Sequence, residues 1–310
     1  MEGAFAGAGR GDGLMEVLDQ FVVTMLRSST PIILAAVAGL FAIRAGVFHL
    51  GMEGLMLAAA FTAVAAGTVT GSVWAGLTCA VLACLGLSLL YWVLVDRLRA
   101  DTVIAGLGLT AVCVGGTAFL MQAIFGQRGS MQSPVRLPRP VTGAQEGILA
   151  FVSELSVMTW CLPLLVLAGW VLLTRSRLGL QIAAVGSYPY GAEAAGVNQS
   201  RVRLHAILIT GVGCALAGAQ LSVGDLSSFS ENMTNGRGFI ALAAMLFGAR
   251  SPLLTALAGL FFGFADAFGI LIQINADGTV PRQFVLMVPF VVTIVIVALS
   301  SSLGKRRRQD

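Results

Sequence analysis

Long apolar runs, separated by short polar stretches, occupy most of this chain. Because a helix needs roughly 20 apolar residues to cross the hydrocarbon core of a bilayer, each long run predicts a membrane-spanning helix. The predicted spans are 22–43, 55–70, 72–95, 102–125, 157–174, 204–224, 237–249, 252–274 and 284–301. We therefore predict an all-α polytopic membrane protein with about eight to ten transmembrane helices, in a single transmembrane domain at 21–301.

One predicted span, 237–249, is too short to cross a bilayer as a simple helix. Non-helical backbone is tolerated at membrane depth only where protein or a water-filled cavity shields its polar groups. We therefore expect some spans to be broken or re-entrant. The glycines and prolines inside the apolar runs support this expectation, since both residues interrupt regular helices.

Composition strengthens the membrane assignment and excludes most other classes. Of the 310 residues, 57% are apolar and 11% are charged, whereas a soluble domain has roughly a quarter charged residues. The five cysteines are scattered and have no partners at metal-ligand spacing, so neither a metal site nor a disulfide framework is predicted. No Ser/His/Asp or paired-carboxylate pattern suggests an intramembrane enzyme, so we predict no catalytic residue.

The distribution of basic residues predicts the orientation in the membrane. Cytoplasmic loops carry an excess of Lys and Arg, and here that excess falls on the loops 96–101 and 175–203 and on the tail 302–310. The segment 1–20 and the long loop 126–156 are then expected outside the cell. A basic tail directly after an apolar run is typical of a cytoplasmic anchor, so no nucleic-acid partner is predicted.

The cytoplasmic loop 175–203 contains a stretch of small residues, 192–196, introduced by Pro189. Proline is favoured at the first position of a helix and glycine just after its end. The sequence therefore predicts a short helix that starts after Pro189 and stops at Gly196. Its smooth surface would suit a groove on a partner protein; alternatively, the helix simply connects two spans.

An active transporter needs an energy source, and the chain has no phosphate-binding G-x-x-x-x-G-K-[ST] pattern. Ionisable residues at membrane depth are the other usual source, because proton or sodium coupling depends on them. Among the carboxylates, only Asp266 lies clearly inside a predicted span. From the residues alone, Asp266 either serves a self-sufficient secondary carrier or makes a helix-end or inter-helix hydrogen bond. A membrane scaffold without transport is a third hypothesis.

Three stretches, in order, carry a resemblance to a known family. The first is RAGVFHLGMEGLML at 44–57, the second runs from Gly179-Leu180 through Val185-Gly186 and Pro189 to AEAAG at 192–196, and the third is MTNGRGFIALA at 233–243, followed by Phe247-Gly248 and Pro252. They resemble the membrane subunits of ATP-binding-cassette (ABC) importers for simple sugars, nucleosides and branched-chain amino acids. The first and third stretches look most like the nucleoside branch.

The resemblance implies a fold, a function and partners. The fold would be the type II, vitamin-B12-importer-like permease fold, in the bacterial cytoplasmic (inner) membrane. The chain would be a permease subunit that moves a small polar solute, delivered by an extracytoplasmic substrate-binding lipoprotein. A nucleoside is the solute expected first, and riboflavin or a simple sugar would also be consistent with related systems. ATP and Mg²⁺ would bind a separate cytoplasmic ATP-binding subunit, so this chain would hold no cofactor. A second homologous permease, expected to be a different chain, would complete the pair amid membrane lipid.

The resemblance also implies roles for individual residues. The second stretch would be the coupling helix that inserts into the ATPase, through Ser187, Tyr188, Pro189, Ala192, Glu193, Ala195 and Gly196. The glycine-rich breaks at 49–54 and 231–238, with Phe229 just before the second, would line the translocation path, at His49, Gly51, Glu53, Gly54, Phe229, Asn232, Gly236 and Gly238. The alternatives are a helix cap for Glu53 and tight packing at a helix start for Gly236 and Gly238. His49 replaces the family's usual Asn, and Ala183 its usual Arg.

Overall fold

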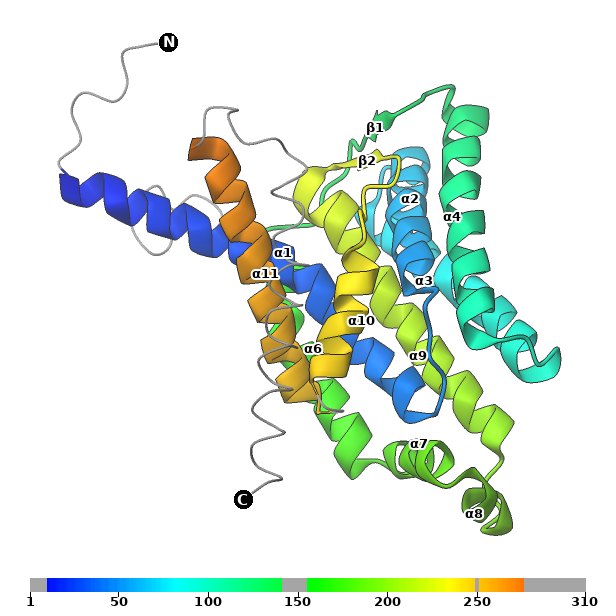
Figure 1. Cartoon of the computed structure of the whole chain (residues 1–310). Coiled ribbons are helices and arrows are strands. Elements are labelled where there is room, and N and C mark those ends of the chain that lie inside the picture. Colours follow the sequence, from blue (N-terminus) through cyan, green and yellow to red (C-terminus); the bar gives the residue numbers. More distant parts are fainter. Residues whose placement is uncertain (1–9, 141–154, 249–250, 276–310) are drawn as a thin grey trace. The chain divides into compact units, whose positions relative to one another are not determined.

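The computed structural model describes residues 10–140, 155–248 and 251–275 (Figure 1). The helices are α1 (Arg10–Arg44), α2 (Met52–Thr70), α3 (Val73–Trp92), α4 (Thr102–Phe125), α6 (Val157–Arg175), α7 (Arg177–Ser187), α8 (Pro189–Ala194), α9 (Gln199–Ala219), α10 (Arg237–Phe247) and α11 (Pro252–Asn275). Two π-helical turns, η1 (Val93–Arg97) and η2 (Gln220–Leu226), extend α3 and α9. Two short strands are β1 (Ser130–Gln132) and β2 (Ser228–Ser230).

Within the described residues, seven helices are long and apolar enough to cross a membrane. They correspond to seven of the nine predicted spans. Of the other two, 237–249 forms α10, which has 11 residues, and 284–301 lies outside the described residues. A helix of that length reaches about 17 Å, roughly half the hydrocarbon thickness. The expectation of a broken or re-entrant span is therefore confirmed at α10.

The chain divides into two compact units. The larger unit is the continuous stretch 30–259. The other unit combines the described parts of 1–29 and 260–310, in which Phe21 and Phe264 make an edge-to-face contact at 5.3 Å. A Cβ on Gly263 would overlap the Ser29 hydroxyl, so α1 and α11 pack closely within this unit.

Helix α2 lies at the centre of the larger unit. A helix that is apolar on every side is stable only when it is surrounded by other apolar groups. In the most apolar 18-residue segment of α2, 72% of the residues are buried inside the protein, against 22% in the corresponding segment of α3 and 28% in that of α4. Helices α3 and α4 therefore expose broad apolar faces that lipid or another subunit would cover.

Small residues let the helices around α2 approach closely, as is usual between helices in a membrane. A Cβ on Gly218 of α9 would overlap the Met56 carbonyl of α2. A Cβ on Gly54 would lie 2.7 Å from the Thr110 Cα of α4, although Gly54 already belongs to α2. The sequence placed Gly54 in a break, and that assignment is wrong, because this glycine makes room for a helix crossing.

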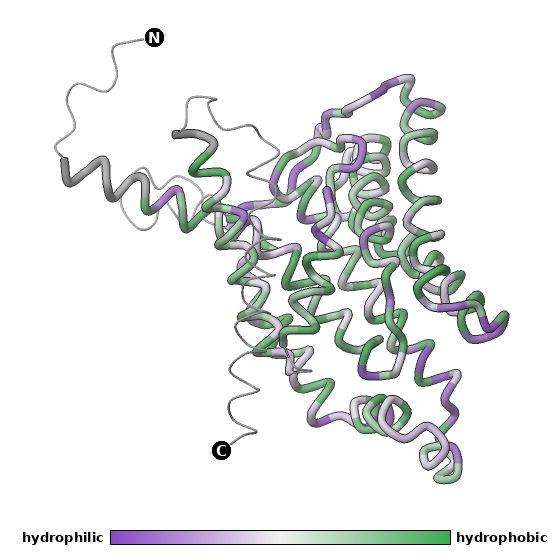
Figure 2. Tube along the Cα trace, viewed as in Figure 1, coloured by the Kyte–Doolittle hydropathy of each residue, from purple (hydrophilic) through white to green (hydrophobic). Residues whose placement is uncertain are grey.

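The two ends of the larger unit carry the two predicted loop systems. Figure 1 shows α7, α8 and the turn before α4 at one end and the β1–β2 pair at the other. The strands are antiparallel, with Met131 opposite Phe229. Hydrophilic residues gather at both ends, and hydrophobic residues follow the helices between them (Figure 2). The loops 96–101 and 175–203 thus share one face, as the basic residues predicted.

Candidate functional site

The segment between α6 and α9 forms two short helices instead of an open loop. The Ser176 hydroxyl accepts a hydrogen bond from the Gly179 N–H at 3.0 Å and caps the start of α7. Helix α8 begins at Pro189, whose fixed φ suits the first helical position. It ends before Gly196, which has a left-handed φ of 80° that glycine adopts without strain. The predicted helix between Pro189 and Gly196 is confirmed.

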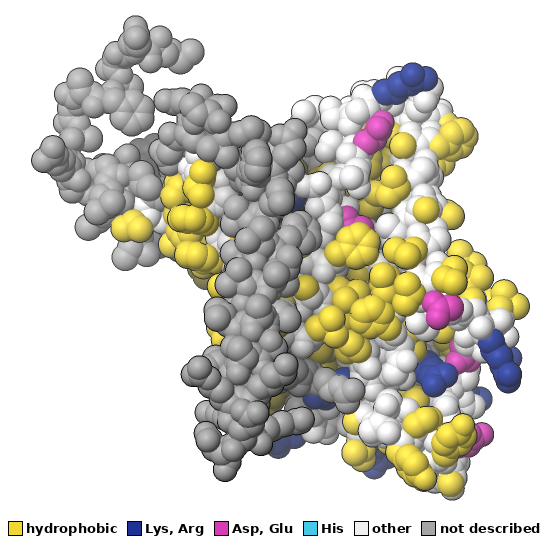
Figure 3. Space-filling view, viewed as in Figure 1, with side chains coloured by type: hydrophobic (Ala, Val, Ile, Leu, Met, Phe, Trp, Pro, Cys, Tyr) yellow, Lys and Arg dark blue, Asp and Glu magenta, His cyan; other side chains and the backbone are white. Residues whose placement is uncertain are grey.

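Helix α8 and its flanks present most of the predicted coupling residues on the surface. The exposed members are Ser187, Tyr188, Glu193, Ala195 and Gly196. Pro189 is half-buried, and Ala192 is buried, so Ala192 packs α8 onto the chain instead of facing outward. Tyr190, which the sequence did not single out, is 80% exposed, and Tyr188 is 67% exposed. Hydrophobic side chains are visible at this tip in Figure 3. Exposed aromatic residues away from the membrane spans are typical of a protein-binding surface.

The first residue of α9 ties α8 in place. The Gln199 side-chain amide donates to the Pro189 carbonyl at 3.0 Å and to the Glu193 carboxylate at 3.1 Å. Glu193 and Gln199 border a polar cleft of about 510 Å³ that continues to Asp96 and Arg203. Helix α8 is therefore fastened at both its ends to the start of α9.

The next residues of α9 join this segment to the end of α3. The Ser200 hydroxyl donates to the Asp96 carboxylate, and Arg203 pairs with Asp96 at 3.6 Å. The Trp92 ring N–H donates to the Ser200 carbonyl at 3.2 Å. Sequence analysis missed these residues. Asp96, Ser200 and Arg203 belong to the two loops that carry the basic residues, and this position was the signal that could have identified them.

Helix α7 rests directly on the end of α1. A Cβ on Gly186 would overlap the Arg44 carbonyl oxygen, and Gly46 follows with a left-handed φ of 81°. Arg44 begins the first resembling stretch, and Gly186 belongs to the second. Backbone contact therefore links two stretches that are far apart in the sequence.

The break between α1 and α2 contains a buried histidine. His49 is 1% exposed and stacks on the Tyr91 ring with centroids 3.8 Å apart. The Tyr91 hydroxyl donates to the Thr102 carbonyl at 3.0 Å. Within the described residues neither ring nitrogen of His49 has a hydrogen-bond partner. His49 lies between two spans, and its burial lowers the pKa of the imidazole to about 3, because desolvation disfavours the charged form.

Replacing His49 by asparagine should make the folded protein less sensitive to acid. Below pH 6.5 the unfolded chain protonates this residue while the folded chain does not, so stability falls as the pH falls from 6.5 towards 3. Between pH 7.5 and 5.5 His49 should cost the wild type about 1.4 kcal/mol of unfolding free energy. Thermal unfolding in detergent at the two pH values would measure this loss. His205→Asn, at an exposed histidine, is the control, and equal acid sensitivity of wild type and His49→Asn would contradict the prediction.

A carboxylate from α2 caps the start of α10. Glu53 accepts hydrogen bonds from the Gly236 N–H at 2.8 Å and from the Gly238 N–H at 2.6 Å. The first N–H groups of a helix have no partner inside it, and a carboxylate there also favours the helix dipole. A Cβ on Gly238 would lie 2.6 Å from the Glu53 Cα. The cap expected as the alternative for Glu53 is therefore present, as is the tight packing at Gly238. Glu53 and Gly238 lie within the first turns of α2 and α10, so placing them in breaks was wrong.

The remaining predicted path residues have different surroundings. Phe229 of β2 is fully buried and packs edge to face on Phe61 at 5.3 Å. Asn232 is exposed in the turn before α10, with a φ of 56°. Gly51 lies against the His49 ring, since a Cβ there would be 3.0 Å from the imidazole Cε1. The described contacts thus form two small groups, Gly51 with His49 and Glu53 with the start of α10.

A buried amide in η2 was missed by the sequence analysis. Gln220 is fully buried; its oxygen accepts from the Ser156 hydroxyl at 2.7 Å, and its nitrogen donates to the Asp225 carboxylate at 3.0 Å. The cluster holds the end of α9 against the start of α6. The signal was an amide inside an apolar run, because a buried amide needs partners.

In the described part of the chain no group of three or more His, Cys, Asp or Glu side chains is arranged to hold a metal ion. Asp266 lies in α11 and is half-buried.

Comparisons with known proteins agree on one family. A family model described as branched-chain amino acid transport system / permease component matches residues 21–297. The guanosine ABC transporter permease protein NupQ of Bacillus subtilis is 30% identical, covering 94% of this chain and 94% of its own length. The nucleoside ABC transporter permease protein NupC of Lactococcus lactis is 29% identical, covering 92% and 93%. The putative glucose ABC transporter permease protein TsgC13 of Haloferax volcanii is 33% identical, covering 80% and 76%.

A solved structure has a similar fold. PsaBC from Streptococcus pneumoniae, in complex with Fab, superposes with a TM-score of 0.52 at 11% identity, covering 88% of each chain.

Proposed function

The chain belongs to the family of permease components of branched-chain amino acid transport systems, and on that premise we propose that it carries nucleosides in an ATP-driven importer. It is a permease subunit of an ABC transporter, with the type II permease fold that the sequence predicted, and a multi-pass protein of the bacterial inner membrane. The secondary carrier built on Asp266 is thereby set aside.

The nucleoside assignment rests on NupQ and NupC, which match more than nine-tenths of the chain. Two glucose permease relatives from Haloferax volcanii match 80% and 93% of the chain, and they make a sugar the main competing substrate. Riboflavin is a further competitor from the sequence resemblance.

The single observation that supports ATP hydrolysis on a partner subunit as the energy source is the exposed surface of α8. Tyr188 and Tyr190 are exposed at the start of this short helix. Gln199 holds the helix against α9, and the preceding helix, α7, packs on the end of α1. We propose that this helix inserts into a cytoplasmic ATP-binding subunit. ATP and Mg²⁺ would bind there and not on this chain. Closure of the ATPase would move α8, and the backbone contacts would pass that movement to the spans as a rigid-body shift.

Two more partners belong to the proposal. A second permease, expected to be a different homologous chain, would cover exposed apolar residues such as Val112 and Phe119 of α4, which are 65% and 69% exposed. A substrate-binding lipoprotein would meet the opposite end, where β1 and β2 lie. Membrane lipid would surround the remaining apolar surface.

The proposed translocation path runs beside α10. The turn before this half-length helix, from Asn232 to Gly236, has exposed polar side chains that could contact a polar solute. Glu53, Gly54 and Gly238 would fix the geometry of that helix, and His49, Gly51, Phe229 and Asn232 complete the predicted set. The polar ribose and base of a nucleoside would require such hydrogen-bonding groups.

The substrate is tested in proteoliposomes that contain the permease with its ATP-binding and second permease subunits. Labelled guanosine should accumulate when ATP and the binding protein are supplied. Unlabelled nucleosides should compete with it, whereas glucose and riboflavin should not. Accumulation of glucose or riboflavin without guanosine would overturn the nucleoside assignment.

A substitution at the end of α8 should uncouple ATP hydrolysis from transport. The double variant combines the bulky substitution Glu193→Trp with Gly196→Val. The valine is a β-branched residue at a left-handed φ of 80°, which costs roughly 1–2 kcal/mol locally. Uptake should fall at least about tenfold, while membrane insertion and basal ATP hydrolysis persist. The control is Gly126→Val, where φ is 65° at the opposite end. Unchanged uptake in the double variant would count against the coupling role.

A further inference from the structure

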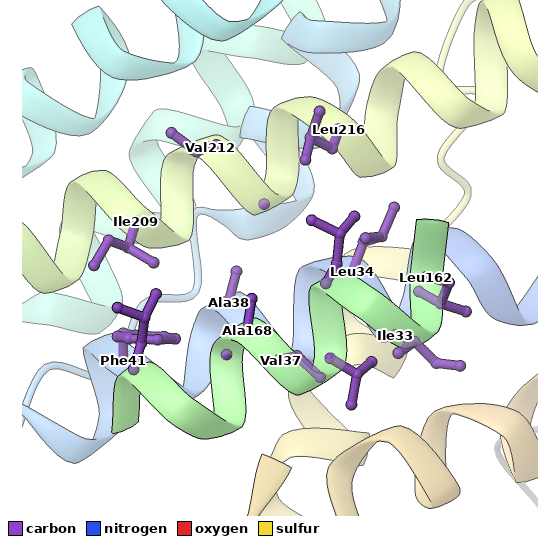
Figure 4. A pocket seen from close by; sticks show the side chains of 15 residues that line it. Ile33, Leu34, Val37, Ala38, Phe41, Leu162, Ala168, Ile209, Val212 and Leu216 are labelled. Carbon is purple, nitrogen blue, oxygen red and sulfur yellow. The ribbon is translucent and has the colours of Figure 1, made fainter. Parts of the chain in front are cut away.

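An apolar groove lies between α6 and α9, with α1 as its floor (Figure 4). Its volume is about 260 Å³, and all fifteen lining residues are apolar. The floor residues Ala38 and Phe41 are buried, whereas Ala168 and Leu172 on the α6 side are exposed. The groove is therefore accessible from the surface of the larger unit.

Small residues create this groove. A Cβ on Gly169 of α6 would lie 2.9 Å from a Val37 methyl group of α1, and a Cβ on Gly213 of α9 would overlap Ala38. Both helices thus press onto α1 at glycines. Because Ala38 and Ala168 are small as well, no side chain in the described part of the chain fills the space that remains between α6 and α9.

All three helices are membrane spans, so the groove opens at a depth where the surrounding medium is hydrocarbon. Apolar cavities of even about 150 Å³ stay free of water and bind apolar molecules. The groove follows α1 from Ile33 to Phe41, about 12 Å, and α6 from Leu162 to Leu172, about 15 Å. This elongated shape suits a segment of acyl chain better than a compact solute.

One end of the groove leads to basic groups. Figure 4 places Phe41 and Ile209 at one end and Leu162 and Leu216 at the other. The Phe41 end is the one nearer α7 and α8. Arg44 follows Phe41 by three residues, and Arg175 follows Leu172 by three, a distance of about 4.5 Å along each helix axis.

The basic end also has an interfacial aromatic residue. The Arg175 guanidinium lies over the Trp170 ring at 6.0 Å. Tryptophan and arginine are enriched where helices leave the hydrocarbon, and basic pockets between spans bind anionic headgroups. The apolar groove and the basic end are separate observations, and together they suit a molecule that has an apolar chain and an anionic group.

We propose that this groove binds one acyl chain of an anionic phospholipid whose phosphate lies at Arg44 and Arg175. The lipid would fill the space between α6 and α9, the two spans that bracket α7 and α8. Its occupancy would therefore hold apart the two helices from which the coupling segment is suspended. The site is independent of which solute is transported.

The test uses the complete transporter in bilayers of equal phosphatidylcholine and phosphatidylglycerol, with a photoreactive diazirine in the phosphatidylglycerol acyl chain. Mass spectrometry should find the label on α6 and α9 peptides that line the groove. Ala168→Trp fills the groove and should reduce that labelling at least about tenfold, since each displaced methylene weakens retention roughly fourfold. The matched control is Leu164→Trp on the same helix, at a 66% exposed residue outside the lining, and it should label as the wild type does.

Two further measurements keep the proposal falsifiable. Ala168→Leu is a milder filling variant, to be used if the tryptophan variant does not fold, and it should show an intermediate loss of labelling. Arg175→Gln should remove the preference for phosphatidylglycerol over a phosphatidylcholine probe with the same label. Equal labelling of Ala168→Trp and Leu164→Trp would overturn the proposal, because it would identify the lipid as ordinary annular lipid. A cross-link from the groove to residues 284–301 or to the second permease would also overturn it, because protein would then occupy the groove.

Discussion

Replacing Glu53 by alanine should abolish uptake and lower the free energy of unfolding by about 3 kcal/mol. Glu53 is 4% exposed and is the acceptor for the N–H groups of Gly236 and Gly238. Bonds to a charged acceptor contribute roughly 1.5–3 kcal/mol each, and a buried N–H without an acceptor is itself costly. The start of α10 would also lose its attachment to α2. ATP-dependent uptake, thermal unfolding in detergent and hydrogen exchange at 236–240 would measure these effects.

Two variants separate this role from a general loss of charge. Glu53→Gln keeps one acceptor oxygen but turns an NH₂ group towards the second N–H, so its effect should be intermediate. Glu231→Ala removes a carboxylate that accepts from the Gly129 N–H at 2.9 Å on an exposed turn, and it should cost less than about 1 kcal/mol. Normal uptake and normal hydrogen exchange in Glu53→Ala would sink the proposed attachment.

The second large effect is expected from a single methyl group at Gly186. In Gly186→Ala the new Cβ would overlap the Arg44 carbonyl oxygen, and backbone cannot swing aside as a flexible side chain can. Helix α7 must then move away from α1, at a cost of roughly 1–3 kcal/mol, and α8 moves with it. Uptake should fall at least about tenfold while the ATPase still hydrolyses ATP.

The control for this variant is the same glycine-to-alanine substitution at a position where the new methyl group has room. A Cβ on Gly86 of α3 would meet no atom of the described residues within 4 Å, and alanine is a better helix former than glycine by up to about 1 kcal/mol. Gly86→Ala should therefore be neutral or slightly stabilising in the same uptake and unfolding assays. Wild-type uptake in Gly186→Ala would show that the α7–α1 contact does not transmit movement.

These two contacts explain why three distant stretches carry one family resemblance. The first stretch touches the second where Arg44 meets Gly186, and it touches the third where Glu53 meets Gly236 and Gly238. At Gly54, Gly186 and Gly238, another part of the backbone occupies the space that a side chain would need. The three stretches therefore form one connected assembly between the coupling segment and the half-length helix.

Apolar length and charge alone were sufficient for much of the architecture. Seven spans are present where long apolar runs predicted them, because crossing a bilayer requires a continuous apolar helix whatever its neighbours are. The short run at 237–249 predicted a half-length helix for the same reason. Pro189 and Gly196 predicted the limits of α8, since both residues act through their own backbone conformation. Basic residues predicted which loops share a face.

Tertiary contacts decided the roles of individual residues. Nothing near Glu53 in the sequence indicates that its carboxylate caps a helix more than 180 residues later, so the sequence left both a position in the path and a helix cap open. Asp96, Ser200 and Gln220 were missed because a polar side chain acquires its partner only when distant helices pack. The groove between α6 and α9 likewise arises from how two glycines seat their helices on α1. Hydropathy and local conformation are properties of a segment, whereas hydrogen-bond partners and cavities are properties of the packed chain, and only the structure could provide them.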